Sequence, residues 1–368
     1  MRVAHVGKFY PPEYFGGLEA VVVGINDEIQ KQGLAGAALV AALSGPTRTD
    51  AYRGVTVRRV RSLGTLFSQP IVPSFASELR GLSADVLHLH HPNPLGDLAV
   101  MGDRRPLVIT QHSDIVRQAV LRPLYLPLLQ RAFRQAKVIT VGSKGLLDTS
   151  NELAPFRDKA RVVPFGIDPA RFVPDAATLA RADELRAAFG GRPVVLAVGR
   201  LVTYKGFDVL IQAMSGLDAQ LVIVGSGPEA DRLRELTTHH SPLTTHLAGR
   251  VSDADLLAWY HACDIFCLPS LTIAEAFGMV LLEAMACGKP LVTSRLPTGV
   301  SEVNRDGVTG LQVPPGDAEA LRTALAKLLG DGEQRRAFGA AAQRVQREEY
   351  SAELMGQRFV QLYRDVAG

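Results

Sequence analysis

The sequence predicts an α/β protein with two domains, each built on a doubly wound parallel sheet. The chain has 368 residues, more than a single hydrophobic core usually holds. Short apolar runs alternate with helical stretches along its whole length, as in parallel sheets that helices cover on both faces. Prolines and a glycine interrupt this alternation between Pro164 and Pro174, so we place the domain boundary there.

The expected strands are short runs rich in valine, leucine and isoleucine. In the first half they are Val3–Gly7, Leu39–Leu43, Val55–Val60, Val86–Leu89, Leu107–Thr110, Val138–Val141 and Val162–Val163. In the second half they are Val194–Val198, Leu221–Val224, Thr245–Leu247, Ile265–Leu268, Leu291–Thr293 and Gly310–Gln312. We expect a final helix over Tyr350–Val366. Because sheets of this kind bind ligands at the carboxyl ends of their strands, the loops that follow the strands are the first places to look for a site.

Composition and charge exclude several classes of protein. Hydrophobic residues make up 47% and charged residues 21%, as in ordinary globular proteins, and no apolar run is long enough to span a membrane. The net charge of +3 is too small to suggest nucleic acid as a partner. The three cysteines are an odd, sparse set that favours a reducing compartment, and the N-terminus does not have the pattern of a signal peptide. We expect a cytoplasmic protein.

Two glutamates, Glu275 and Glu283, stand eight residues apart in an otherwise apolar segment. Charged side chains are rare and costly in apolar surroundings, so we expect these glutamates to have a specific role. Eight helical residues would place both carboxylates within about 80° of one face. We expect Glu275 just before the helix, beside the N–H groups and positive dipole end that favour an anion. The alternative is an ordinary amphipathic helix with solvated glutamates.

Two cations follow the strand Val194–Val198. Arg200 and Lys205 are bracketed by Gly199 and Gly206. Cations at this spacing can clamp a diphosphate and neutralise the charge that grows on it as a leaving group. The alternative is a pair of surface residues, which the bracketing glycines disfavour.

Two further motifs have competing interpretations. The run from Gly225 to Ala230 fits the loose glycine pattern of dinucleotide-binding loops. The next strand, however, ends at Gly249 without the acidic residue that a nicotinamide cofactor requires. Asp253-Ala-Asp255 spells a metal-binding D-x-D, but it follows Ser252 at the start of a helix, where capping explains it better. We expect neither a metal nor a cofactor.

Histidines near strand ends are the other candidates. His112 follows the strand Leu107–Thr110 and is expected to face a ligand, with a structural hydrogen-bonding role as the alternative. His88 and His90 share one strand face and His91 the other. Since no convergent fourth ligand is visible, we interpret them as strand-end packing rather than a metal site.

Basic residues are concentrated in the first half, where residues 1–170 hold 20 Lys and Arg against 14 Asp and Glu. Within it, the segment 115–137 has basic residues and interleaved apolar ones but no acidic residue. Such a segment can lie on an anionic bilayer. The alternative is a packed surface helix with snorkelling arginines.

The order and spacing of these motifs resemble the retaining glycosyltransferases of family 4, which have the GT-B fold. The resemblance extends over nearly the whole chain. It rests on Gly16-Gly17-Leu-Glu19, Gln111-His112-Ser113, Pro164-Phe-Gly-Ile-Asp168, Gly199-Arg200-Leu-Val-Thr-Tyr-Lys205-Gly206 and the E-x7-E pair Glu275 and Glu283.

The resemblance implies two Rossmann-like domains that face each other across a cleft. Residues 1–168, with the C-terminal helix 350–368, would bind the acceptor, and residues 169–349 the nucleotide-sugar donor. Arg200 and Lys205 would bind the diphosphate, Glu275 the sugar and Glu283 the ribose. Further donor contacts are implied for Gly16, Gly17, Arg250, Val251, Phe277, Gly278, Met279 and Val280. His112 would lie near C6 of the sugar, and with Glu275, Arg200 and Lys205 it completes the implied catalytic set. Glu19, at a helix start, has capping as its competing explanation.

One departure from the family's usual sequence narrows the expected sugar donor and acceptor. Relatives commonly carry two glycines where this chain has Thr298-Gly-Val-Ser-Glu302. This form, with Lys8-Phe-Tyr-Pro-Pro, looks most like bacterial mannosyltransferases of surface-polysaccharide assembly. The resemblance therefore implies metal-independent, retaining transfer of mannose from GDP-mannose to a hydroxyl of a lipid-linked saccharide, at the inner face of the membrane.

The alternatives that remain open are a UDP-sugar-dependent relative with a small-molecule acceptor, an epimerase or phosphorylase, and a binding-only subunit. We expect Glu275→Ala and His112→Ala to abolish transfer while folding stays largely intact.

Overall fold

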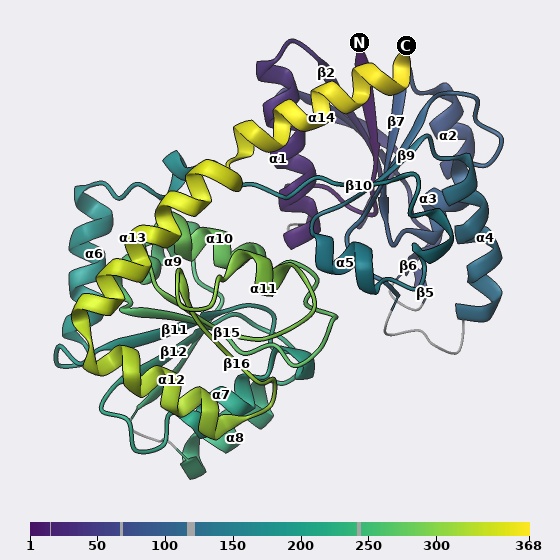
Figure 1. The fold of residues 1–368 in the computed structure, drawn as a ribbon. Helices are drawn as coiled ribbons and strands as arrows, with labels where there is room; N and C mark the ends of the chain where they lie inside the picture. The colour runs from purple at the N-terminus through teal and green to yellow at the C-terminus, as the bar shows by residue number, and fades with distance from the viewer. Residues whose placement is uncertain (15, 67–68, 116–121, 241–243) are drawn as a thin grey trace. The chain divides into compact units, whose positions relative to one another are not determined.

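Both predicted parallel sheets are present in the structure, which is a computed structural model (Figure 1). It describes residues 1–14, 16–66, 69–115, 122–240 and 244–368, with only the backbone described at 122–124, 239 and 240. The chain divides into one unit of residues 1–166 and 352–368 and a second unit of residues 167–351. The boundaries expected from the sequence, after residue 168 and before residue 350, lie close to these.

The first unit is built on an eight-stranded sheet in the order β10-β9-β8-β7-β1-β2-β4-β3. Its strands are β1 (Arg2–Val6), β2 (Ala35–Ala41), β3 (Arg48–Tyr52), β4 (Val55–Val60), β7 (Val86–His91), β8 (Leu107–Gln111), β9 (Val138–Val141) and β10 (Ala160–Val162). Its helices are α1 (Gly17–Lys31), α2 (Phe75–Gly81), α3 (Pro94–Ala99), α4 (Arg122–Gln135), α5 (Lys144–Thr149), the short η1 (Ala154–Phe156) and α14 (Ala352–Ala367).

Every neighbouring pair of this sheet is parallel except β3 and β4. The polar edge strand β3 and the small hairpin of β5 (Thr65–Leu66) and β6 (Gln69–Pro70) were not predicted from the sequence. They lack the apolar run by which the other strands were recognised.

The second unit is built on a six-stranded parallel sheet in the order β13-β12-β11-β14-β15-β16. Its strands are β11 (Val194–Val198), β12 (Gln220–Val224), β13 (Thr245–Gly249), β14 (Ile265–Leu268), β15 (Leu291–Ser294) and β16 (Gly310–Val313). Its helices are α6 (Ala176–Ala187), α7 (Phe207–Ala213), α8 (Ala230–His240), α9 (Asp253–Ala262), α10 (Met279–Ala286), α11 (Gly299–Val303), α12 (Ala318–Gly330) and α13 (Gly332–Glu349), with the short η2 (Pro169–Phe172) and η3 (Thr203–Lys205).

Each sheet has one point where the strand order reverses. In the first sheet it lies between β1 and β7, and in the second between β11 and β14. Ligands of doubly wound sheets bind outside the carboxyl ends of the strands at such a point. The topology therefore directs attention to the loops that follow these four strands.

The C-terminal helix α14 belongs to the first unit, where it packs along α1 (Figure 1). Gly356 permits the close approach, since a Cβ there would lie 2.3 Å from Cβ of Glu28. On the sheet side, Phe359 and Tyr363 are fully buried. This helix therefore helps to cover the strands that carry the histidines.

The basic segment 115–137 contains α4. In its described part, Leu129 and Phe133 are buried in the core, whereas Arg131, Arg134 and Lys137 are exposed. Arg117 and Leu121 lie outside the described residues, and only the backbone of Arg122 is described. The described part is thus a packed surface helix, with its charged face outward. No helix in the described part of the chain combines the length and apolar character of a membrane span.

Candidate active site

Lys205 and Glu275 form a buried ion pair at the switch point of the second sheet, which is the point where its strand order reverses. Lys205 ends η3, in the loop after β11, and Glu275 lies in the turn after β14. Lys205 Nζ is 2.5 Å from Glu275 Oε2, and the two residues are only 7% and 8% exposed. The buried Ser270 donates a hydrogen bond of 3.0 Å to the same carboxylate oxygen. Two groups therefore orient this carboxylate.

The Lys205 ammonium is charged at neutral pH. Burial lowers the pKa of the Lys205 ammonium, but the attraction of Glu275 and Tyr204 and the hydrogen bond to Glu275 together raise it by more, so the net pKa lies above its ordinary value. A buried ion pair adds little net stability, because the cost of desolvating two charges is close to what their attraction returns. The pair instead presents a cation and a hydrogen-bond acceptor at the ligand-binding edge of the sheet.

Gly206 determines how closely the two loops approach. Its φ of 67° lies in the left-handed region, which glycine enters without steric cost. A Cβ at Gly206 would also lie 2.2 Å from the carbonyl oxygen of Pro269. Next to it, the N–H of Leu271 donates a 2.7 Å hydrogen bond to the carbonyl of Tyr204. The loops after β11 and β14 are thereby joined at the backbone.

The glycine-rich loop after β12 braces the loop that carries Arg200. The N–H of Gly199 donates to Val224 and that of Leu201 donates to Ser226, each at 3.0 Å. A Cβ on Gly225 would lie 1.9 Å from the carbonyl oxygen of Gly199, and one on Gly227 would lie 2.2 Å from that of Leu201. Packing between loops accounts for both glycines, so the dinucleotide pattern needs no cofactor to explain it.

Arg200 itself is exposed, and it forms no ion pair within the described ranges. Lys205 differs in this respect, because its charge is already paired with that of Glu275. The predicted pair of cations therefore consists of one solvated guanidinium and one buried ammonium, and an incoming diphosphate would meet the former without first breaking an ion pair.

Glu275 lies just before the helix, as predicted, but the predicted common helical face of the two glutamates is wrong. Helix α10 begins only at Met279, after Gly278 with a φ of 80°, so Glu275 and Glu283 do not share a helical face. The left-handed Gly278 ends the turn that holds Glu275. Glu283 lies one turn into the helix, where Tyr260 of α9 donates a 2.6 Å hydrogen bond to its Oε2. Burial raises the pKa of Glu283, and the bond from Tyr260 acts in the opposite direction.

Some of the other expected donor contacts lie around this turn. Phe277 is buried, and Met279 and Val280 are half-buried at the N-terminus of α10. There the first backbone N–H groups have no partner within the helix. After β13, Arg250 is exposed and Val251 is half-buried.

The segment from Thr298 to Glu302 has one glycine where relatives commonly have two, and close packing around Gly299 requires that glycine. A Cβ on Gly299 would lie 2.7 Å from the ring of Phe277. Thr298 caps α11, since its side chain accepts a hydrogen bond from the N–H of Val300. The N–H of Gly299 also donates to the carbonyl of Ala276 at 2.9 Å, which ties the loop after β15 to the turn of Glu275.

The expected role of the D-x-D motif as a helix start is confirmed. Ser252 caps α9 by accepting a 3.0 Å hydrogen bond from the N–H of Asp255. The Asp255 carboxylate pairs with Arg181 at 2.9 Å. Asp255 is therefore already used in capping and in a surface ion pair.

In the first unit, Glu19 lies in the first turn of α1 with Gly16 as the N-terminal cap residue. Burial raises the pKa of Glu19 to about 6, although hydrogen bonds from the backbone N–H groups of Glu19 and Gly16 and the charge of Lys8 pull it down. Glu19 thus binds the start of its own helix, as the capping alternative predicts. A Cβ on Gly17 would meet nothing within 4 Å, so open space lies beside this residue.

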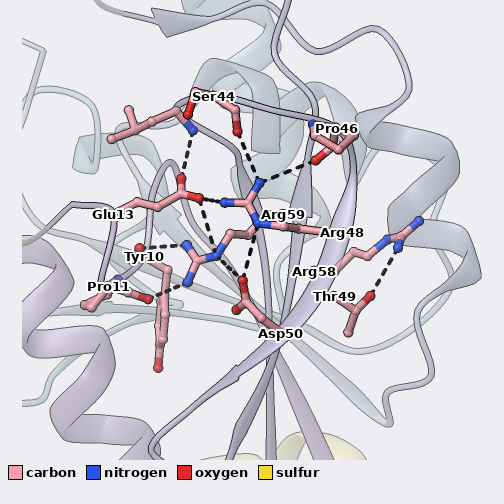
Figure 2. A network of polar contacts seen from close by, with 11 residues as sticks. Tyr10, Pro11, Glu13, Ser44, Pro46, Arg48, Thr49, Asp50, Arg58 and Arg59 are labelled. Atoms are coloured by element: carbon pink, nitrogen blue, oxygen red, sulfur yellow. Dashed lines mark hydrogen bonds and ion pairs between the residues drawn. The ribbon is translucent and has the colours of Figure 1, made fainter.

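A buried arginine holds the loop that leads to Gly16 (Figure 2). Arg59 of β4 is 1% exposed. It donates to the carbonyls of Tyr10 at 2.8 Å and Pro11 at 2.5 Å, and to the Asp50 carboxylate of β3 at 2.8 Å. Glu13, in the same loop, pairs with Arg48 and accepts a 2.8 Å hydrogen bond from the N–H of Leu43. The loop after β1 is therefore fastened to the β3–β4 hairpin.

His112 lies at the end of β8, partly exposed, and stacks on Phe165. Its Nε2 is 3.1 Å from Nδ1 of His90, whose Nε2 is in turn 2.9 Å from Nδ1 of His5. The sequence predicted His88 and His90 on one face of β7, and the structure adds His5 of β1 to that face. His91 has a different partner, the hydroxyl of Tyr125 at 2.9 Å.

Nitrogens of His5, His88 and His90 lie within 4.8 Å of one another, near enough to hold a metal ion. Hydrogen bonds already engage both nitrogens of His88, with the hydroxyls of Tyr363 and Thr110 at 2.6 Å each. Both nitrogens of His90 are engaged as well. Hydrogen bonds therefore engage every ring nitrogen of His88 and His90, and among the described residues only the buried Nε2 of His5 in this cluster has no partner.

Sequence reasoning missed four side chains that support the site: His5, Arg59, Tyr260 and Ser270. The only sequence signal for them is position, since Ser270 closely follows a predicted strand and His5 lies within one. Which residues they contact depends on the order of the strands, which the sequence pattern does not reveal.

Comparison with known proteins identifies the family. Residues 15–171 match "Glycosyltransferase Family 4", and residues 182–345 match "Glycosyl transferases group 1". The chain is 35% identical to "D-rhamnosyltransferase WbpZ" of Pseudomonas aeruginosa, over 96% of this chain and 93% of that protein. It is 29% identical to "O-antigen chain mannosyltransferase C" of Escherichia coli, over 99% and 98%.

A third relative is "GDP-mannose-dependent alpha-(1-6)-phosphatidylinositol monomannoside mannosyltransferase" of Mycolicibacterium smegmatis. It is 34% identical over 73% of this chain and 72% of that protein. Among solved structures, sucrose-phosphate synthase from Thermosynechococcus elongatus has the same fold, with a TM-score of 0.83 and 22% identity over 99% of this chain and 98% of that one. The chain therefore belongs to the family 4 glycosyltransferases and has their GT-B fold of two Rossmann-like domains.

Proposed function

We propose that this glycosyltransferase moves mannose, with retention of anomeric configuration, from GDP-mannose to a hydroxyl of a lipid-linked saccharide. The observation that carries the proposal is the buried Lys205–Glu275 pair at the switch point of the second sheet. A nucleoside diphosphate sugar offers a phosphate for such a cation and hydroxyls for such a carboxylate.

Each predicted site residue then has one task. Arg200 and Lys205 neutralise the diphosphate as it leaves, and the N–H groups at the start of α10 add the positive end of its dipole. Glu275 accepts hydrogen bonds from the sugar hydroxyls. Glu283, held by Tyr260, accepts from the ribose. His112 contacts the sugar.

The chemical step follows the route expected from the family. The acceptor oxygen bonds to C1 on the face from which the diphosphate departs, while the bond from C1 to the phosphate oxygen breaks. The acceptor proton passes to a phosphate oxygen of the leaving group. The protein then contributes orientation and electrostatic stabilisation, and the two cations replace a metal ion.

The acceptor class is supported by the relatives, since one is named for the O-antigen chain and another for a phosphatidylinositol mannoside. A lipid-linked acceptor requires the enzyme to work at a membrane surface. The exposed Arg131, Arg134 and Lys137 at the end of α4 are suited to anionic headgroups. Contact of this kind would be electrostatic, since the apolar side of the described helix is buried.

A second candidate donor is the GDP derivative of D-rhamnose, the 6-deoxy form of mannose. It is favoured by the D-rhamnosyltransferase relative, which is 35% identical over almost the whole chain. The two donors differ only at C6, where the resemblance places His112. Side-by-side assays with both GDP-sugars decide between them.

The test is ligand-dependent thermal unfolding with GDP, UDP and ADP and then with the matching nucleotide sugars, each in EDTA. It is followed through Trp259, the single tryptophan of the chain, which lies in the second unit. At a ligand concentration about 100 times Kd, binding adds about 2.7 kcal/mol, which raises Tm by roughly 5–10 °C for a domain of this size. A GDP-selective shift in EDTA supports the proposal.

A UDP-selective shift would instead favour a UDP-sugar-dependent family member. Loss of the shift in EDTA would contradict metal independence, and no shift with any nucleotide would favour a binding-only subunit. Transfer itself is then measured with the selected donor on lipid-linked saccharides. His112→Ala should strongly reduce its rate while leaving the fold intact, and wild-type turnover by this variant would remove His112 from the site.

A further inference from the structure

Three imidazoles form a hydrogen-bonded series that ends at His112. Nδ1 of His5 lies 2.9 Å from Nε2 of His90, and Nδ1 of His90 lies 3.1 Å from Nε2 of His112. His5 and His90 are 0% and 1% exposed. At the far end of the series, Nε2 of His5 is buried and has no hydrogen-bond partner among the residues that the structure describes.

All three rings are neutral at neutral pH. Burial lowers the pKa of His5 and of His112 to about 3. Burial, with the neighbouring His88, His5 and His112, lowers the pKa of His90 well below its ordinary value. A neutral imidazole has one N–H and one lone pair, so each ring donates at one nitrogen and accepts at the other.

Two proton arrangements keep both hydrogen bonds. In the first, every ring carries its proton on Nδ1, so that His5 donates to His90 and His90 donates to His112. This arrangement leaves an unused lone pair at Nε2 of His5. In the second, every ring carries its proton on Nε2 and the series runs the other way, which leaves an N–H buried at His5 without an acceptor. Buried N–H groups without a partner are rarer than under-used acceptors, so the first arrangement is favoured.

We propose that His5 and His90 hold His112 in the Nδ1–H tautomer, which makes His112 a hydrogen-bond donor to the bound sugar and not a base. Its Nε2 accepts from His90 and its Nδ1 carries the proton, so neither nitrogen is left to take a proton from a hydroxyl. The contact with the sugar rests on the proposed function, whereas the tautomer does not. His5 and His90 act through His112 and are positioning residues.

The direct test is nuclear magnetic resonance of the full chain labelled with ¹⁵N-histidine. Long-range proton–nitrogen correlation spectra distinguish a protonated ring nitrogen from one with a lone pair. The signals are assigned by their loss in His5→Phe and His112→Asn. We expect Nδ1–H in His5, His90 and His112. Free neutral histidine prefers Nε2–H, so an unconstrained ring would not give this result. Nε2–H as the major form of His112 would overturn the proposal.

His90→Phe removes the donor to His112 and should release its ring to the Nε2–H form. The matched control is His88→Phe, two residues away on the same strand face, because His88 makes no hydrogen bond to the series. Folding of both variants is checked by circular dichroism. His112 should keep Nδ1–H in the control, and retention of Nδ1–H in His90→Phe as well would contradict the positioning role.

Kinetics separate this inference from the proposed function. The substitution His112→Asn would place a side-chain amide N–H where Nδ1–H stands, so this variant should turn over roughly tenfold faster than His112→Ala, the worth of one good hydrogen bond. Equal rates of the two variants would contradict the donor role. Wild-type turnover by His112→Ala would refute the contact with the sugar while the spectra still report the tautomer.

Discussion

Removing one member of the buried Lys205–Glu275 pair should cost far more stability than removing both. Lys205→Met or Glu275→Gln leaves the other charge unpaired at a position only 7–8% exposed. Breaking a buried pair in this way costs about 3–5 kcal/mol, whereas replacing both members by uncharged groups of similar volume is often near neutral. The two single effects should therefore fail to add by several kcal/mol in the double variant.

The assay is urea unfolding followed by the fluorescence of Trp259. This residue is the single tryptophan, is 4% exposed and lies in α9 of the second unit, so it reports on the unit that contains the pair. Free energies of unfolding come from linear extrapolation. Arg234→Met is the control, because it removes one member of the surface ion pair with Asp231, whose side chains are 66% and 91% exposed. Such pairs contribute little.

A double variant that loses as much stability as the two single variants together would refute this reasoning. The pair also revises an expectation from the sequence, in which Glu275→Ala left folding largely intact. The structure instead predicts a loss of about 3–5 kcal/mol. A loss of transfer in this variant is therefore meaningful only where Trp259 shows that the second unit is still folded.

Three further outcomes are expected. Arg200→Ala should leave stability unchanged and weaken donor binding by roughly tenfold or more, the worth of a charged hydrogen bond; unchanged kinetics would remove Arg200 from the site. Tyr260→Phe should lower the free energy of unfolding by about 1–3 kcal/mol, because Glu283 loses its buried donor, and it should weaken nucleotide binding in calorimetry, because Glu283 is no longer held in one orientation; unchanged affinity would leave Tyr260 a structural role alone. Glu19→Gln should stabilise the first unit by about 2 kcal/mol at pH 8, measured by circular dichroism in urea, and much less at pH 5. Burial raises the pKa of Glu19 from 4.5 to about 6, so the stability it contributes is present below its unfolded pKa and is lost as the pH rises through about 6. An equal gain at both pH values would contradict this account.

The sequence pattern predicted those parts of the fold that depend on local apolar runs. Val194–Val198 and Ile265–Leu268 were placed correctly because each is a buried strand with an unbroken apolar sequence. Strand β3 (Arg48–Tyr52) was missed, since it is polar and lies at the edge of the sheet. Its contribution comes through Asp50, whose partner Arg59 stands on the next strand.

The candidate site was predictable residue by residue but not as an arrangement. Glycines on both sides of Lys205 marked its loop, and an apolar segment marked Glu275. Their pairing depends on β14 lying next to β11, which the strand order determines and no local pattern shows. His5 escaped notice for the same reason, because it meets His88 only through the register of β1 with β7.

The late start of helix α10 divides the two glutamates between separately supported segments. Glu275 belongs to a turn held by Lys205 and Ser270, and Glu283 belongs to a helix held by Tyr260. The part proposed to meet the sugar can therefore be rebuilt while the part proposed to bind the nucleoside is left unchanged. For a designer who wants a new sugar transferred from the same nucleotide, the turn before Gly278 is the segment to vary and α10 is the segment to keep.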